Sequence, residues 1–298
     1  KNLPSLNPGR VSLFSTNQRF PASHLRALLY DVAVIAIRFI GQLMLSFVTY
    51  LGELSLLCAS IGESLRHGRK RLRLILQQIA EIGYRSQPVV MVTGAFTGAV
   101  LTAQSLFQFS KFGMETMGGA LVSVAMLREL GPVVTGLMLA GRVGASMAAE
   151  IGTMKVTEQI DALRVMNVSP IDYLVTPRLL AMLIAIPLLI GESAALGIIA
   201  ANVVGIEVFG IGEAYWKYQM QNFTDLTDVA FSLIKGGVFG VIIIVVSCHQ
   251  GLQASQGAAG VGRGTTRAMV YSSLLILVAN FFLTLLLNLI FPAGARLG

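Results

Sequence analysis

Four charged residues stand inside long apolar stretches of the sequence: Arg128, Glu129, Glu192 and Lys235. An ionisable side chain in hydrocarbon is costly, so it normally has a partner or a function. Arg128 and Glu129 are adjacent and would point about 100° apart on a helix, so each needs a partner elsewhere, and Lys235 is an obvious partner for Glu129. Such groups form a structural ion pair, line a path for a lipid headgroup, or relay ions.

The other reactive residue types do not indicate an enzyme. Cys58 and Cys248 give no disulfide framework, three histidines are scattered, and no Ser/His/Asp or Cys/His set is found. The glycine-rich segment 257–266 resembles a phosphate loop only superficially, because it lacks the Gly-Lys-Ser/Thr ending. We therefore expect a flexible loop at 250–264, with Thr265 or Thr266 capping the helix that follows, and no cofactor in this chain.

The composition predicts an all-α integral membrane protein. The chain has 298 residues, of which 54% are hydrophobic and only 12% are charged, and its mean hydropathy is +0.72; soluble proteins carry about 25% charged residues. Apolar runs long enough to cross a bilayer recur along the chain. We expect about five transmembrane helices, at 88–109, 120–149, 174–205, 229–249 and from about 265 to 291.

Most basic residues lie next to these spans, so the net charge of +7 sets membrane orientation and does not indicate a nucleic-acid partner. This asymmetry places the N-terminus in the cytoplasm. Residues 1–24 are expected to be a polar arm, 25–85 an interfacial helix with a basic flank, and 86–298 the five-span domain. The outer-face segment 207–228 is net acidic, and its Trp216 and Tyr218 suit a helix at the interface.

The N-terminal helix has two interpretations. Its polar residues recur at spacings of seven and four, which makes one narrow stripe on an apolar helix: Asp31, Arg38, Gln42, Thr49, Glu53 and Ser60. A helix in the interface turns this stripe to water at little cost, whereas a crossing helix would place Arg38 or Glu53 near hydrocarbon. We predict the interfacial arrangement, and the crossing of 25–61 stays open.

A polar amphipathic helix is expected at 154–170, on the cytoplasmic side. One face is apolar and charges surround it: Val156, Ile160, Leu163 and Met166, with Glu158, Asp161 and Arg164. On its own this pattern fits a connector lying at the headgroups or a helix that docks into a partner. In the first span, Gly94 and Gly98 form a small-xxx-small pattern typical of close helix packing.

The stretch Leu127–Arg178 carries the motifs LRELGP, GRVGASMAAEIGTMKVTEQIDAL and SP…PR. It resembles the MlaE/YrbE-type permeases, the membrane subunits of ABC transporters that move phospholipid. A weaker likeness extends from about Ser46 to Leu287. The resemblance implies a homodimer and a separate cytoplasmic ATPase that binds ATP and magnesium. It also implies an MCE-domain lipid-binding protein on the outer face.

The resemblance further implies roles for particular residues. The segment 154–170 becomes the helix that couples to the ATPase, through Glu158, Gln159, Asp161, Leu163, Arg164 and Met166. A lipid cavity between protomers would be lined by the first span and by the intramembrane charges: Leu101, Gln104, Gln108, Phe109, Arg128, Glu129 and Lys235. Asn280 stands where some relatives have aspartate, so a role that needs a carboxylate there does not transfer.

The expected function is movement of glycerophospholipid between the inner and outer membranes, by a multi-pass protein of the bacterial inner membrane. The chloroplast inner envelope is the alternative location. The rival function is an ion-coupled secondary transporter that uses Glu129, Glu192 and Lys235; inverted repeats would favour it, and none is found in the sequence. A membrane scaffold without transport is a third possibility. Direction, headgroup and acyl-chain preference are not set by the sequence.

Overall fold

The computed structural model describes residues 22–67, 72–255 and 257–291. The chain divides into two compact units, 1–53 and 54–298, each described by itself. The first contains the beginning of α1 (Ala22–His67), where Arg38, Gln42 and Thr49 of the predicted polar stripe are exposed. Most of the predicted polar arm, 1–24, and part of the basic flank, 68–71, lie outside the described residues.

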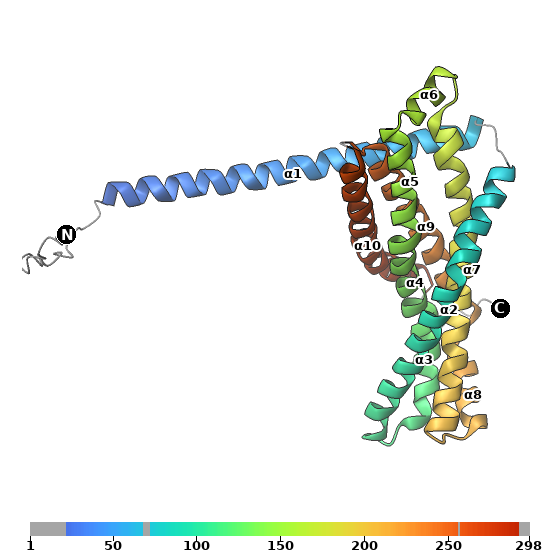
Figure 1. Cartoon of the computed structure of the whole chain (residues 1–298). Helices are drawn as coiled ribbons and strands as arrows, with labels where there is room; N and C mark the ends of the chain where they lie inside the picture. The colour runs from blue at the N-terminus through green and yellow to red at the C-terminus, as the bar shows by residue number, and fades with distance from the viewer. Residues whose placement is uncertain (1–21, 68–71, 256, 292–298) are drawn as a thin grey trace, which may run out of the picture. The chain divides into compact units, whose positions relative to one another are not determined.

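The second unit is helical throughout its described residues. After the end of α1 its elements follow in this order: α2 (Leu72–Ser110), η1 (Glu115–Met117), α3 (Gly118–Ala125), η2 (Met126–Leu130), α4 (Gly131–Leu139), η3 (Ala140–Gly144), α5 (Ala145–Val156), α6 (Gln159–Val165), η4 (Ile171–Val175), α7 (Thr176–Val203), η5 (Val204–Val208), α8 (Glu213–Phe223), α9 (Leu226–Leu252) and α10 (Gly257–Ile290). Within this unit, α6 lies at one end of the helix bundle and α8 at the opposite end (Figure 1).

The predicted class, an all-α multi-pass membrane protein, is confirmed. Six helical stretches among the described residues are long and apolar enough to cross a membrane: 44–66, 72–110, 118–156, 171–208, 226–252 and 257–290. The last five match the predicted spans. The remaining stretch, Met44–Arg66, is additional to the five predicted spans and lies in the helix predicted to be interfacial. Length and composition are common to crossing and interfacial helices, so its placement stays a prediction.

The glycine-rich loop predicted at 250–264 was wrong. Helix α9 runs to Leu252 and α10 begins at Gly257, so Thr265 and Thr266 lie inside α10 and their hydroxyls bond to backbone carbonyls one turn earlier. One glycine of this segment, Gly260, is required by close packing. A Cβ on Gly260 would lie 1.3 Å from the carbonyl oxygen of Ser255.

Glycines also decide how α2 packs. A Cβ on Gly98 would lie 2.1 Å from the carbonyl oxygen of Gly197, and one on Gly94 would lie 2.5 Å from that of Ser193. Both partners are on α7, so the small-xxx-small pattern brings two helices of one chain into backbone contact. The same approach would be impossible with a side chain at either position.

Trp216, which was predicted to suit an interfacial helix on the outer face, lies inside the bundle. Its side chain is fully buried and clusters with Leu106 and Met220, while its indole Nε1 donates to Asn202 Oδ1 at 2.8 Å. A Cβ on Gly205 would meet the indole ring at 2.8 Å. The ring therefore anchors α8 to the bundle, whereas Tyr218 is exposed, as an interfacial residue would be.

Candidate functional site

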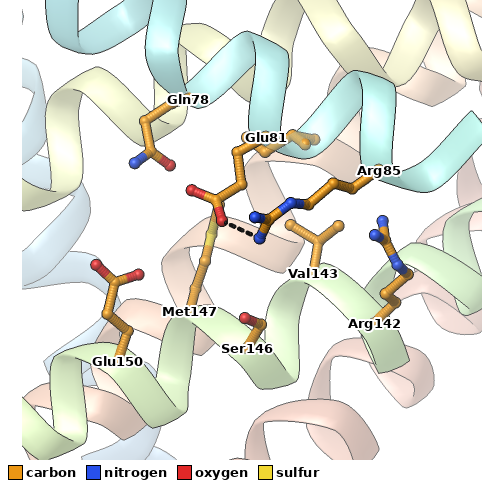
Figure 2. A pocket seen from close by; sticks show the side chains of 9 residues that line it. Gln78, Glu81, Arg85, Arg142, Val143, Ser146, Met147 and Glu150 are labelled. Atoms are coloured by element: carbon orange, nitrogen blue, oxygen red, sulfur yellow. Dashed lines mark hydrogen bonds and ion pairs between the residues drawn. The ribbon is translucent and has the colours of Figure 1, made fainter.

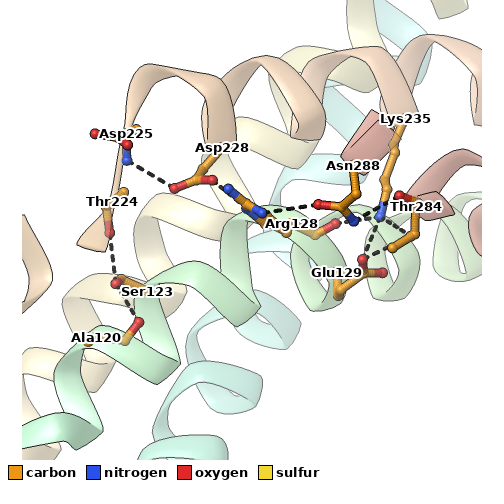
Figure 3. Close-up of polar contacts among 10 residues, drawn as sticks. All are labelled: Ala120, Ser123, Arg128, Glu129, Thr224, Asp225, Asp228, Lys235, Thr284 and Asn288. Carbon is orange, nitrogen blue, oxygen red and sulfur yellow. Dashed lines mark hydrogen bonds and ion pairs between the residues drawn. The ribbon is translucent and has the colours of Figure 1, made fainter. Parts of the chain in front are cut away.

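The predicted pair of Lys235 and Glu129 is present in the structure. Lys235, on α9, is fully buried, and its Nζ lies 2.9 Å from Glu129 Oε1. The same ammonium donates to the backbone carbonyl of Arg128 at 2.6 Å and to Thr284 Oγ1 at 2.9 Å. Its three hydrogens therefore have three acceptors, as Figure 3 shows.

Proline explains why a backbone carbonyl is available to this lysine. In an α-helix the carbonyl of residue 128 would accept a hydrogen bond from the amide of residue 132. Residue 132 is proline and has no N–H to donate. The structure places Lys235 Nζ on the carbonyl instead. Arg128 and Glu129 lie in η2, a single turn of π-helix, which is a form often found at functional sites.

Glu129 also accepts hydrogen bonds from α10. Thr284 Oγ1 lies 2.9 Å from Glu129 Oε1, and Asn280 Nδ2 lies 2.9 Å from Oε2. An amide at position 280 donates to the carboxylate, whereas an ionised aspartate there would repel it. The asparagine therefore fits a network that already holds one carboxylate.

The partner of Arg128 is Asp228, at the start of α9. Arg128 Nε donates to Asp228 Oδ1, and Nη1 donates to Asn288 Oδ1 at 3.4 Å. The guanidinium also lies 5.0 Å from the centroid of the Phe231 ring. Asp228 is only 1% exposed and also accepts from the backbone amide of Asp225 at 2.9 Å, which caps α9. One carboxylate thus fixes both a helix start and an intramembrane arginine (Figure 3).

An apolar groove of about 490 Å³ is lined in part by η2, the turn that also carries Arg128 and Glu129. Its lining comes from α2 and η2: Phe96, Thr97, Val100, Leu101, Gln104 and Leu130. Leu130 directly follows Glu129, so the groove and the charges share one turn of helix. Of the predicted cavity residues on α2, Leu101 and Gln104 line the groove; Gln108 and Phe109 are one to two turns further along α2 and do not.

The helix predicted at 154–170 is shorter than expected. Helix α5 continues to Val156, and α6 spans only Gln159–Val165. Glu158 and Asn167 both have the left-handed backbone conformation, with φ of 60° and 57°, which interrupts a right-handed helix on each side of α6. Only the second break has a signal in the sequence, because asparagine adopts this conformation more readily than glutamate and Pro170 follows it.

The side chains of α6 are also arranged differently from the prediction. Of the predicted apolar face, Ile160 is fully buried in the bundle, whereas Met166 is 64% exposed. Val165, which was not assigned to that face, is 88% exposed. Asp161 pairs with Lys155 at 3.2 Å and with Arg164 at 3.1 Å. Glu158 and Gln159 are exposed and Leu163 is half-buried.

Glu192 does not join the network. It lies on α7 and is half-buried, and no hydrogen bond or ion pair within the described ranges connects it to Glu129 or Lys235. Three residues of the network were not predicted from the sequence: Asp228, Thr284 and Asn288. Two patterns would have found them: Asp225 and Asp228 are spaced as a capping box, and Asn280, Thr284 and Asn288 recur every four residues on one face of α10.

The chain is similar to known permease proteins. A family model described as Permease MlaE matches residues 75–286. A probable ABC transporter permease of Rickettsia conorii is 42% identical over 245 residues, which cover 82% of this chain and 95% of the relative. The chloroplastic protein TRIGALACTOSYLDIACYLGLYCEROL 1 of Arabidopsis thaliana is 38% identical over 217 residues, 73% of this chain and 62% of the relative.

A third relative is the intermembrane phospholipid transport system permease protein MlaE of Haemophilus influenzae. It is 33% identical over 258 residues, which cover 86% of this chain and 97% of the relative. The match to the family model, residues 75–286, covers most of α2, most of α10 and everything between them. This chain belongs to the MlaE family of ABC transporter permeases.

Proposed function

We propose that this chain is the membrane subunit of an ABC transporter that moves glycerophospholipid between the inner and outer membranes. The observation that carries the proposal is the apolar groove of about 490 Å³ that shares η2 with the Arg128–Glu129–Lys235 network. A phospholipid has an apolar body and a charged headgroup, and this juxtaposition offers a surface to each. The printed name of the Haemophilus relative supports the same substrate class.

The transporter needs a separate cytoplasmic ATPase, which binds ATP and magnesium. Val165 and Met166 support α6 as the element that couples to it, because two large apolar side chains are exposed together at the end of the bundle. An ABC transporter has two membrane halves, so the chain works as a homodimer with the lipid cavity between protomers. An MCE-domain protein receives or delivers lipid at the outer face.

The proposed location is the bacterial inner membrane, with the N-terminus in the cytoplasm. The Rickettsia and Haemophilus relatives are bacterial, and the chloroplastic relative supports the inner envelope as the alternative. The rival ion relay is less well supported. All three hydrogens of Lys235 are engaged by fixed acceptors, and Glu192, the third proposed member, lies outside the network.

Lipid transfer by the reconstituted complex tests the proposal. In the double variant Glu129→Leu/Lys235→Met neither charge is left unpaired, so the protein should fold and its ATPase should still hydrolyse ATP. Lipid transfer should be strongly reduced, because the groove has lost its polar neighbour. A matched control is Lys111→Gln, which removes an exposed charge from the turn after α2. Full transfer by the double variant would show that the pair is only structural and would refute the headgroup role.

A further inference from the structure

A polar cavity of about 130 Å³, separate from the apolar groove, lies between the start of α2 and the η3–α5 segment. Figure 2 shows its side chains extending from the two elements toward one another. Its polar lining consists of Gln78, Glu81, Arg85, Arg142, Ser146 and Glu150. No member of the Arg128–Glu129–Lys235 network lines it, so the two sites are separate.

Two arginines and two glutamates line this cavity, but of the two arginines only Arg85 forms an ion pair with a carboxylate. Glu81 pairs with Arg85 at 2.8 Å, and Glu150 pairs with Arg178 at 2.7 Å. Arg142 donates to the buried hydroxyl of Ser86, and no carboxylate within the described ranges forms an ion pair with it. By contrast, the intramembrane cations Arg128, Arg178 and Lys235 each have a carboxylate partner.

A half-buried guanidinium without a carboxylate is suited to an anion from outside the chain. Arginine presents five N–H donors, and Ser86 accepts from only one terminal nitrogen of Arg142. The remaining donors match two phosphate oxygens in parallel, which is the geometry in which arginine binds phosphate best. The cavity holds about four water molecules at roughly 30 Å³ each, which is room for a phosphate group but not for an acyl chain.

Exposed apolar side chains on α2 continue from this cavity. Val89, Val92 and Phe96 are 36%, 55% and 68% exposed, and they follow Arg85 at spacings of four, three and four, on one face of the helix. Phe96 belongs to the lining of the apolar groove. A molecule with a phosphate and long apolar chains can therefore bind at Arg142 and extend along α2 to the groove. Free phosphate has no apolar part that could pack on these side chains.

We propose that Arg142 binds the phosphate of a glycerophospholipid in a cytoplasmic-side site, at the end of the apolar face of α2 that leads to the groove. The site rests on the proposed function for its substrate class and for the cytoplasmic assignment of this end of the bundle. Glu150 lies less than two turns before α5 ends at Val156, and α6 follows directly. The site is thus next to the element that would meet the ATPase.

Photo-crosslinking tests the site in the full chain with its ATPase, in nanodiscs containing phosphatidylethanolamine with a diazirine in its headgroup. In the wild type, crosslinks should map to 78–85 and 142–150. Arg142→Gln should lower their yield at least about tenfold, the change that corresponds to about 1.4 kcal/mol. Arg142→Lys keeps the charge but not the paired donors, so it should give a smaller loss. The control Lys111→Gln should not change the yield.

A wild-type yield from Arg142→Gln, or loss of the crosslinks with millimolar inorganic phosphate, would overturn the lipid site. If Arg142→Gln does not fold, Ser86→Ala decides the question, because it removes the hydroxyl that holds the guanidinium and should also lower the yield. Crosslinks at Leu101 and Gln104 report separately on the groove. If the crosslinks at 142–150 depend on Arg142 while lipid transfer is absent, the proposed function fails and the binding site stands.

Discussion

The Glu129–Lys235 pair should respond unequally to removal of its two members. Lys235 is fully buried, whereas the side chain of Glu129 is 38% exposed. Replacing Glu129 with leucine leaves a buried ammonium without a counter-charge. Replacing Lys235 with methionine leaves a carboxylate that keeps Asn280 and Thr284 as donors and that reaches the surroundings. The first change should therefore be the more damaging.

The contacts give the size of this difference. Loss of one partner from a buried pair costs about 3–5 kcal/mol, and the lower end applies to Glu129→Leu, because the pair is partly exposed and two acceptors remain for Lys235. For Lys235→Met the main loss is the hydrogen bond to the Arg128 carbonyl, which Pro132 cannot replace, at about 1–3 kcal/mol. The double variant removes the unpaired ammonium, so it should be more stable than Glu129→Leu alone.

Thermal unfolding of the purified chain in one detergent measures this order. Asn280→Leu serves as a control, because it removes a hydrogen bond to Glu129 without removing a charge. We expect midpoints that fall in the order wild type, Lys235→Met, double variant, Glu129→Leu. The reasoning is refuted if Lys235→Met is the least stable of the three, or if the loss in the double variant equals the sum of the single losses.

Three further predictions concern packing, docking and topology. Gly98→Ala should lower the unfolding midpoint strongly, because its Cβ would lie 2.1 Å from the Gly197 carbonyl oxygen. The control Gly191→Ala has open space around it and should be neutral or slightly stabilising. Equal midpoints for the two variants would contradict the backbone contact between α2 and α7. Val165→Asp should abolish co-purification of the ATPase, while Val208→Asp, at a position that is 71% exposed at the other end of its bundle, should not; retained ATPase would remove α6 from the coupling role. With both native cysteines replaced, cysteines introduced at residues 22 and 72 should react with an impermeant reagent from the same side if 44–66 is interfacial, and reaction from opposite sides would establish a sixth crossing.

The network could be predicted only in part from the sequence. A lysine and a glutamate in apolar runs demand partners, and the pairing of Lys235 with Glu129 followed from that demand. Asp228 was missed because it lies in a polar outer segment, where a carboxylate needs no explanation. Only the three-dimensional fold brings the start of α9 against η2. The sequence analysis likewise could not distinguish Trp216 at an interface from Trp216 in a core, since amphipathic rings are common in both.

Span positions were predictable because about twenty apolar residues are needed to cross a bilayer. The break before α6 was not predictable, because Glu158 takes a left-handed conformation that is unusual for glutamate; the break at Asn167 was overlooked, although asparagine often adopts it. The segment 250–264 shows the converse error. Glycine there was interpreted as flexibility, whereas Gly260 is small because the backbone of Ser255 leaves no room for a side chain.

The glycine contact between α2 and α7 has a mechanical consequence. Two helices in backbone contact cannot slide or separate without losing that contact, so the first and third spans move as one rod. The chain runs from α6 through η4 directly into α7. A displacement of α6 is therefore transmitted through α7 to α2, which forms one wall of the groove. The other wall, at Leu130, is tied to the same pair of helices, because Leu130 and Met126 pack in one cluster with Leu101 of α2 and Ile198 of α7. Both walls of the groove therefore follow α7, and a displacement of α6 shifts the groove as one body.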